Sequence, residues 1–359
     1  MSITIDQILQ FAVKNKVSDV HLKVGRPAIY RKDGKLVPHK GTSEILPIHI
    51  KEWVDQMAGE RHRKTLDEMG EVDFAYSLDG VGRFRVNAFY QRELAGMVLR
   101  IIPSSVLPLA SLSLPRSVHR FTDLRRGLVL VTGATGSGKS TTLAAIINEI
   151  NENRPDHILT IEDPIEFIHE DKRSVVNQRE VGQDTASFVS GLRAALRQDP
   201  DVVLIGELRD LETVETALHA AETGHLVLST LHTTDAAETV SRIITLFPPH
   251  SRDEARKSLA STLKGVVSQR LVPLKEGKGR VAACEVMVVT ELIRDCIANP
   301  EKTHEIRQYI ERGHTSVGSQ TFDQALIAHF RSGLIAEETV FEYASNATDV
   351  RLQLSGITR

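Results

Sequence analysis

The sequence predicts an α/β protein that is built around a phosphate-binding loop, with a smaller α+β domain in front of it. An apolar run at residues 127–131 (GLVLV) leads into a glycine-rich turn, and the turn leads into a stretch whose apolar residues recur at helical spacing. From about residue 119, strand and helix patterns alternate, which is typical of a parallel sheet with crossover helices. Before that point, short strands and hairpin turns predominate.

Composition limits the classes of protein that the chain can belong to. Its 359 residues are 41% hydrophobic, which is enough for packed cores and indicates two domains, or one domain with an appendage. With 44 Lys and Arg against 47 Asp and Glu, the net charge is −3, so no basic excess points to nucleic acid as a partner. No run of about 18 apolar residues predicts a transmembrane segment, and the N-terminus is typical of a helix rather than a signal peptide. Cys284 and Cys296 are expected to be reduced thiols.

Residues 1–102 are predicted to form the small α+β domain. Thr4 and Gln7 fit a capping box at the start of an amphipathic helix. A strand follows at residues 20–24, and Asp33-Gly34 predicts a hairpin turn between two more strands. After a helical stretch at residues 47–59, a second hairpin turns at Asp79-Gly80, and a further strand ends at Pro103.

Residues 103–118 hold three prolines and are predicted to be a linker. The second domain is expected over residues 119–359. Its last part, from about residue 250, is predicted to be mostly helical. Ala255, Leu259, Leu263 and Val266 would lie on one face of a helix there.

The glycine-rich turn fits the motif G-x-x-x-x-G-K-[ST], in which backbone N–H groups surround a phosphate chain at a helix N-terminus. We therefore expect Lys139 to pair with the β- and γ-phosphates of ATP, and the Ser140 hydroxyl to bind Mg²⁺. The predicted nucleotide-binding residues are Gly133, Ala134, Thr135, Gly136, Ser137, Gly138, Lys139, Ser140 and Thr141.

Several predicted strands end at polar residues, and in open parallel sheets ligands bind at the carboxyl ends of the strands. Glu207 follows the apolar run 201–205 (DVVLI) as a Walker B carboxylate does, and we expect it to hold Mg²⁺ through water, although a solvated strand end would look the same. Glu162, Asp163 and Glu166 surround Pro164, and one of them could orient or deprotonate the attacking water. Their spacing does not decide which one.

Two histidines and three arginines complete the candidates. His225 and His232 lie at the two ends of an apolar strand, where neutral imidazoles could hydrogen-bond the γ-phosphate, although structural roles fit them as well. In the first domain, Arg83 and Arg85 share one face of a strand and Arg100 lies on the next strand. They fit either arginine fingers for phosphoryl transfer or ordinary surface charges.

Together these motifs resemble the PilT-type ATPases, the type IV pilus retraction motors of the type II/IV secretion ATPase superfamily. The resemblance covers nearly the whole chain. The segments that carry it are SDVHLKVG, RFRVNAF, GATGSGKSTT, TIEDPIEF, VNQREVG, GLRAALRQDPDVVLIGE and AAETGHLVLSTLHT.

This resemblance implies a PAS-like N-terminal domain, a RecA-like ATPase domain and a homo-hexamer. It implies a cytoplasmic ring at the inner membrane that acts on a pilus platform protein. It also implies that Glu166 is the catalytic carboxylate of an acidic Asp box, that Glu207 is the Walker B residue, that His225 and His232 form a His box, and that Arg85 and Arg100 are arginine fingers.

One segment departs from the family pattern. The retraction motif, usually close to AIRNLIRE, appears here as residues 291–297 (ELIRDCI), in which Arg294 is kept. The related assembly and secretion ATPases add a long N-terminal region and a tetracysteine zinc motif, and this sequence shows neither. The alternatives are an assembly or secretion ATPase, a RecA-like nucleic-acid translocase with a basic pore, and a nucleotide switch without catalysis.

Overall fold

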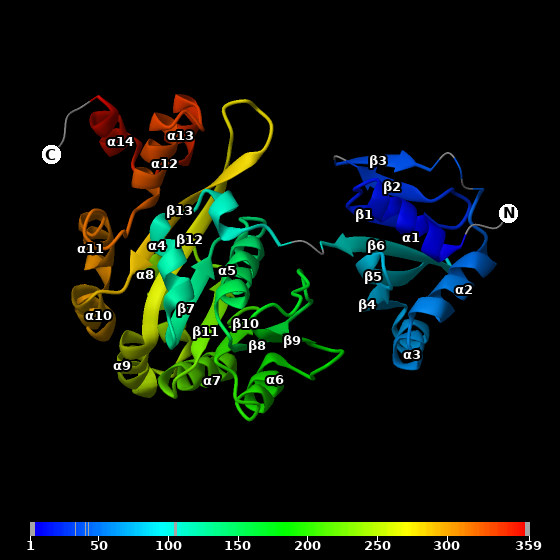
Figure 1. Cartoon of the computed structure of the whole chain (residues 1–359), viewed down its shortest axis with the longest axis horizontal. Helices are drawn as coiled ribbons and strands as arrows, with labels where there is room; N and C mark the ends of the chain where they lie inside the picture. The colour runs from blue at the N-terminus through cyan, green and yellow to red at the C-terminus, as the bar shows by residue number, and fades with distance from the viewer. Residues whose placement is uncertain (1–3, 33, 40, 42, 104–105, 356–359) are drawn as a thin grey trace. The chain divides into compact units, whose positions relative to one another are not determined.

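The computed structural model describes residues 4–32, 34–39, 41, 43–103 and 106–355. The chain forms two compact units, the first comprising Met1–Ser105 and Glu166–Ile168 and the second comprising Val106–Ile165 and His169–Arg359. Figure 1 shows the elements of each unit in chain order. Asp33 of the predicted hairpin and residues 104–105 of the predicted linker lie outside the described residues.

The first unit is an antiparallel sheet with three helices. Its strands are ordered β3-β2-β1-β6-β5-β4. Side chains of α1, α2 and α3 share one core with Val20, Phe84, Leu99 and other residues of the sheet, so the helices cover a single face. The elements are α1 (Ile5–Lys14), β1 (Asp19–Lys23), β2 (Ile29–Lys32), β3 (Lys35–Pro38), α2 (Pro47–Met57), α3 (Glu60–Met69), β4 (Glu71–Leu78), β5 (Gly82–Gln91) and β6 (Leu94–Ile102).

Local sequence explains these elements. The predicted capping box is present at α1, where the Gln7 N–H donates to Thr4 Oγ1 (3.3 Å) and the Thr4 N–H donates to Gln7 Oε1 (3.1 Å). Along β5, buried Phe84 and Val86 alternate with Arg83 and Arg85, so the arginines lie on the face away from the helices. Helix α3 was not predicted, because only Leu66 in it is buried and its apolar periodicity is weak.

The second unit is organised around a seven-stranded sheet of order β13-β12-β7-β11-β10-β8-β9. Neighbouring strands run parallel throughout, except that β13 is antiparallel to β12. The strands are β7 (Gly127–Thr132), β8 (His157–Glu162), β9 (Val175–Glu180), β10 (Val202–Ile205), β11 (Leu226–Leu231), β12 (Leu263–Pro273) and β13 (Arg280–Val288).

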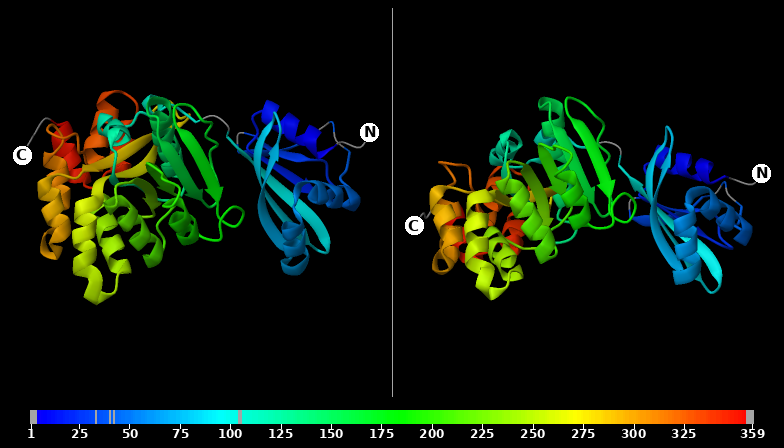
Figure 2. Two further views of the ribbon diagram at one scale, coloured as in Figure 1. Left: turned by 60° about the horizontal axis from the view of Figure 1, so that its bottom comes forward. Right: turned by 90° about the horizontal axis from the view of Figure 1, so that it is seen from below.

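Helices cover both faces of this sheet (Figure 2). The core on one face joins the sheet to α5, η1, α4 and η2, and the core on the other face joins it to helices α6 to α11. A smaller cluster joins β12 and β13 to α12, α13 and α14. The helices are η1 (Leu109–Leu112), α4 (Arg116–His119), η2 (Arg120–Asp123), α5 (Lys139–Asn153), α6 (Phe188–Ala195), α7 (Leu211–Glu222), α8 (Ala236–Leu246), η3 (Pro249–Ser251), α9 (Arg252–Thr262), α10 (Glu291–Ala298), η4 (Pro300–Glu305), α11 (Ile306–Arg312), α12 (Phe322–Arg331), α13 (Glu337–Tyr343) and α14 (Ala347–Leu354).

Two strands, β12 and β13, interrupt the helices in the region from about residue 250, which was predicted to be mostly helical, and the helical face predicted there was wrong. Helix α9 ends at Thr262, and Leu263 begins β12, so Leu263 and Val266 do not share a helical face with Ala255 and Leu259. β12 lies between β7 and β13, and its sequence, LKGVVSQRLVP, groups its apolar and polar residues instead of alternating them strictly. Without that alternation, a buried strand is hard to tell from a helix in sequence.

Both cysteines, Cys284 and Cys296, are buried free thiols, as the sequence predicted. Among the helices that the structure describes, none has the length and apolar character to cross a bilayer.

Candidate functional site

The phosphate loop lies between β7 and α5, as the motif requires. Gly133, Gly136 and Gly138 all adopt positive φ, at 142°, 78° and 91°. The ammonium of Lys139 donates to the carbonyls of Gly133 (2.9 Å) and Ala134 (3.1 Å), so it lies within the curve of the loop. Loop residues 134–136 are exposed to solvent. The loop is thus shaped to surround a phosphate group from the backbone side.

Strand β12 supports the loop from behind. A Cβ on Gly133 would come within 2.5 Å of the Gln269 carbonyl oxygen, so only glycine fits there. Gln269 Nε2 also donates to Thr142 Oγ1 on α5 (3.0 Å), and Thr132 Oγ1 donates to Ser268 Oγ (2.8 Å). The sequence reasoning missed Ser268 and Gln269 because it assigned this stretch to a helix, and no motif marks them.

Glu207 lies just beyond β10, on the same sheet edge as the loop. The register pairs Leu231 of β11 with Thr132 of β7, and Ser229 with Ile205 of β10, so these strands end side by side. The Glu207 carboxylate is mostly buried and contacts the Arg209 guanidinium. His232 Nε2 lies 3.5 Å from Glu207 Oε2, which brings two of the predicted residues together.

Arg209 is a site residue that the sequence reasoning did not select. The hydrogen bond from Arg209 to Glu207, reinforced by the negative charges of Glu207 and Asp163, raises the pKa of the Arg209 guanidinium. The side chain therefore stands within reach of two of the predicted carboxylates. Its place two residues after Glu207, the predicted Walker B residue, is the only signal that the sequence offers.

The three acidic candidates differ in their surroundings. Glu162 Oε1 accepts hydrogen bonds from Thr160 Oγ1 (2.7 Å) and Gln178 Nε2 (3.1 Å), which hold its carboxylate at the end of β8. Asp163 and Glu166 are exposed in the segment that follows. Buried Glu180 of β9 accepts the N–H of Ile165 (3.3 Å) and so fixes this segment from the neighbouring strand.

The structure separates the two histidines. His232 follows the end of β11, but His225 precedes its first residue, and the six residues of the strand span about 20 Å. His225 Nδ1 lies 2.9 Å from the Ala220 carbonyl oxygen at the end of α7. The expectation that both imidazoles reach the γ-phosphate is therefore wrong for His225 within this unit, because parallel strands place their two ends on opposite sheet edges.

In the first unit, Arg85 and Arg100 are direct cross-strand partners on β5 and β6. Arg85 Nε lies 3.6 Å from Asp73 Oδ1, and Arg100 Nε donates to the buried Asp19 carboxylate (2.9 Å). Hydrogen bonds to Arg100 and Ser18, with the charges of Arg100 and Arg31, lower the pKa of Asp19 although its burial opposes this. Both guanidinium groups remain substantially exposed.

The segment that departs from the family motif forms α10. Thr290 caps it by accepting the Ile293 N–H (3.4 Å), and Ile293, Cys296 and Ile297 face the core. Arg294 pairs with Glu291 on the same helix, and Leu292 is 59% exposed.

The family model for type II/IV secretion system proteins matches residues 1–334 of this chain. Over 343 residues the chain is 46% identical to the type IV pilus retractation ATPase PilT of Pseudomonas aeruginosa, covering 95% of this chain and 98% of that protein. The chain belongs to the PilT family of type II/IV secretion ATPases. Another relative is a twitching motility protein of Neisseria gonorrhoeae, 49% identical over 294 residues, with 82% of this chain and 78% of that protein covered.

Solved structures agree with this PilT-family assignment. The crystal structure of the pilus retraction motor PilT with bound ADP matches with a TM-score of 0.89 and 42% identity, covering 97% of this chain and 99% of that chain. The Legionella pneumophila ATPase DotB matches with a TM-score of 0.82 and 29% identity, covering 100% of this chain and 98% of that chain.

Proposed function

We propose that this chain is the ATPase of a type IV pilus machine and drives pilus retraction as a cytoplasmic homo-hexamer. The observation that carries ATP hydrolysis is the meeting of the phosphate loop, Glu207 and His232 at one sheet edge. The match to the retraction ATPase PilT over nearly the full length of both chains supports pilus retraction rather than pilus assembly.

In this proposal, loop residues 133–141 hold the phosphates of ATP and Lys139 pairs with the β- and γ-phosphates. The donor set suits Mg²⁺, which takes few protein ligands and keeps several waters: the half-buried Ser140 hydroxyl stands at the start of α5, and the Glu207 carboxylate lies just beyond β10. When bound, the ion neutralises charge that develops on the phosphates. In this arrangement the Glu207 carboxylate contacts both the Arg209 guanidinium and the hydrated ion.

Glu166 is the proposed general base that orients the attacking water. Hydrogen bonds hold Glu162 in place, whereas Asp163 and Glu166 are both exposed, and the likeness to the PilT family favours Glu166 of these two. His232 is proposed to respond to the γ-phosphate beside Glu207.

Arg85 and Arg100 are proposed as arginine fingers, in a first unit that we assign to the PAS-like class. The second unit is assigned to the RecA-like class on its mainly parallel sheet. The proposed partner is an inner-membrane pilus platform protein, and no nucleic acid partner is proposed because the net charge is −3.

Two substitutions test ATP hydrolysis. Lys139→Ala is expected to lose ATP binding and activity together, because the loop loses its phosphate-pairing charge. Glu166→Gln is expected to bind ATP normally but to hydrolyse it about 10² to 10⁴-fold more slowly, as loss of a general base predicts. Steady-state ATPase rates and equilibrium nucleotide binding measure both effects. If Glu166→Gln keeps the wild-type rate, Glu162 becomes the candidate base.

Deletion of the coding sequence in the source organism tests the direction of force. A retraction motor predicts hyperpiliated cells that do not twitch, because assembly continues without disassembly. Bald cells would instead indicate a pilus assembly ATPase, and unchanged pili a role in another machine. Two observations favour a role in another machine. The α10 segment departs from the retraction motif, and the chain is 37% identical over 284 residues to the type II secretion ATPase E of Vibrio cholerae, although the match covers only 53% of that protein.

A further inference from the structure

A row of side chains crosses four strands at the edge that carries the phosphate loop. The register aligns Leu231 of β11, Thr132 of β7, Ser268 of β12 and Glu285 of β13. Residues directly opposite one another share a face of a sheet. Three of the four are polar, although this face is buried against α8, and Glu285 is only 5% exposed.

Glu285 holds the start of α8. Its Oε1 accepts the N–H of Ala236, the first residue of that helix, at 2.9 Å. A carboxylate there satisfies one of the unpaired N–H groups of a helix N-terminus and meets the positive end of its dipole. Only residues 232–235 separate this point from the end of β11, and His232 is the first of them. The carboxylate on β13 therefore fixes the base of the loop that presents His232 to Glu207.

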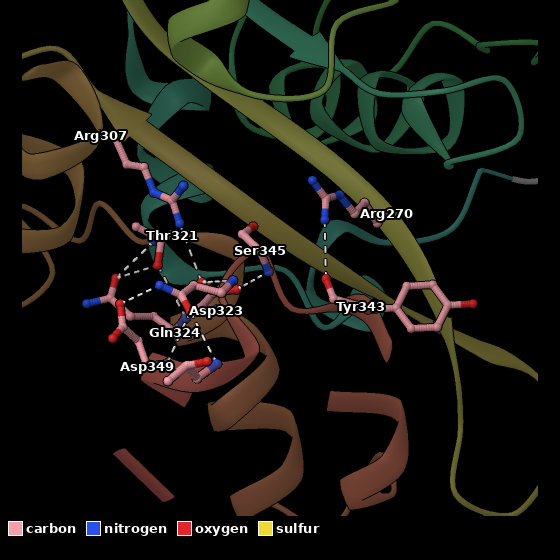
Figure 3. A network of polar contacts seen from close by, with 10 residues as sticks. Arg270, Arg307, Thr321, Asp323, Gln324, Tyr343, Ser345 and Asp349 are labelled. Atoms are coloured by element: carbon pink, nitrogen blue, oxygen red, sulfur yellow. Dashed lines mark hydrogen bonds and ion pairs between the residues drawn. The ribbon is translucent and has the colours of Figure 1, made fainter. Parts of the chain in front are cut away.

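The surroundings of Glu285 leave this helix end as its principal partner. Burial, with the charge of Asp235, raises the pKa of Glu285 to about 7, and the Ala236 N–H and the charges of Arg307 and Arg270 oppose that rise. Figure 3 shows both arginines directed into the C-terminal helices. Arg270 Nη1 donates to the Tyr343 carbonyl (3.2 Å), and Arg307 Nη2 lies 3.5 Å from Asp323 Oδ2.

We propose that Glu285 is a positioning residue for ATP hydrolysis, which acts by anchoring α8 and so holding His232 opposite Glu207. The inference rests on the proposed function. By this inference β13, a strand without a sequence motif, helps to position a residue of the phosphate site.

A matched pair of variants tests it. Glu285→Met fills nearly the same buried space but removes the acceptor, whereas Glu285→Gln keeps an acceptor oxygen and removes only the charge. We expect the Met variant to lose tenfold or more in kcat with an unchanged ATP dissociation constant, because a small misplacement near the reacting atoms costs up to about 10²-fold. The Gln variant should stay within about threefold of wild type. If the Glu285→Met protein does not fold, Glu285→Ala is a second variant that removes the hydrogen-bond acceptor.

Asp323→Asn is the matched control for buried carboxylates. Asp323 is also buried and accepts the backbone N–H groups of Ser345 (2.6 Å) and Asn346 (3.3 Å), but it does so within the C-terminal helices. Its substitution is expected to lower the melting temperature and to leave kcat unchanged.

The decisive measurement combines the Met variant with His232→Ala. If Glu285 acts through His232, adding Glu285→Met to the His232→Ala chain should lower kcat by less than about twofold further, because the effects of coupled residues are not additive. Full additivity, or a Met variant with wild-type kcat, overturns the inference while the proposed function stands. A wild-type chain without ATPase activity overturns the proposed function, and this inference with it.

Discussion

Gly133 shows how one residue without a side chain can be fixed by its surroundings. Its φ of 142° is rare for other residues, and the Gln269 carbonyl and Ser137 Oγ both occupy the space of a Cβ. Gly136 also has a positive φ, but a Cβ added there would meet no atom within 4 Å. The same motif therefore contains one glycine set by packing and one set by backbone conformation alone.

This difference predicts unequal effects of two alanine substitutions. Gly136→Ala is expected to cost about 1–2 kcal/mol of left-handed strain and to keep measurable ATP binding. Gly133→Ala must displace β12 or the loop, so we expect it to cost more and to weaken ATP binding at least tenfold further. Thermal melts and equilibrium binding compare the two. Equal losses in both variants would contradict the role of Gln269 as a backing for the loop.

Residues in short motifs could be read from the sequence, and residues supplied by distant strands could not. The loop and Glu207 were predicted because their neighbours in sequence are also their neighbours in space. Gln269 and Glu285 contribute through sheet register: Gln269 backs a loop more than a hundred positions before it, and Glu285 holds the start of α8, 49 positions before it. No local pattern encodes such pairing.

At the scale of elements, the strands predicted at β7, β8, β10 and β11 are present, and the failures have physical causes. β9 was missed because its edge position leaves mixed polar residues with little periodicity. β12 was taken for a helix because a strand covered on both faces loses its alternation. Its Gly265 is informative in retrospect, since a Cβ there would overlap the Phe121 ring at 2.1 Å, a close approach typical of glycine in strands.

Strand direction also decides which residues of a motif can act together. His225 and His232 are close in sequence, yet a single strand carries them to opposite edges of the sheet. A strand-and-helix pattern suffices to predict that Glu162, Glu207 and His232 lie on one edge, because each lies at the carboxyl end of a parallel strand. The same rule places His225 elsewhere, and the sequence-based prediction did not apply it.

At the scale of the whole molecule, the proposed ring predicts complementation between inactive chains. Arg85→Ala and Glu166→Gln chains are each expected to be nearly inactive, the first because an arginine finger contributes about 10³ to 10⁵ in rate. If the finger acts across subunits, mixed rings contain some sites with both groups intact and regain part of the activity. ATPase assays of co-expressed chains measure this. Mixed rings as inactive as their parents would place Arg85 and Glu166 in the same subunit's site.

The position of β12 has a consequence for synthesis of the chain. β7 carries the phosphate loop but leaves the ribosome more than a hundred residues before β12, which becomes its neighbour in the sheet. Until β12 arrives, one side of β7 is an open strand edge, the kind of surface that pairs wrongly with other chains. We therefore expect nucleotide binding in the nascent chain to wait until β12 has emerged, and we expect a truncated chain that ends before β12 to aggregate through the unpaired side of β7.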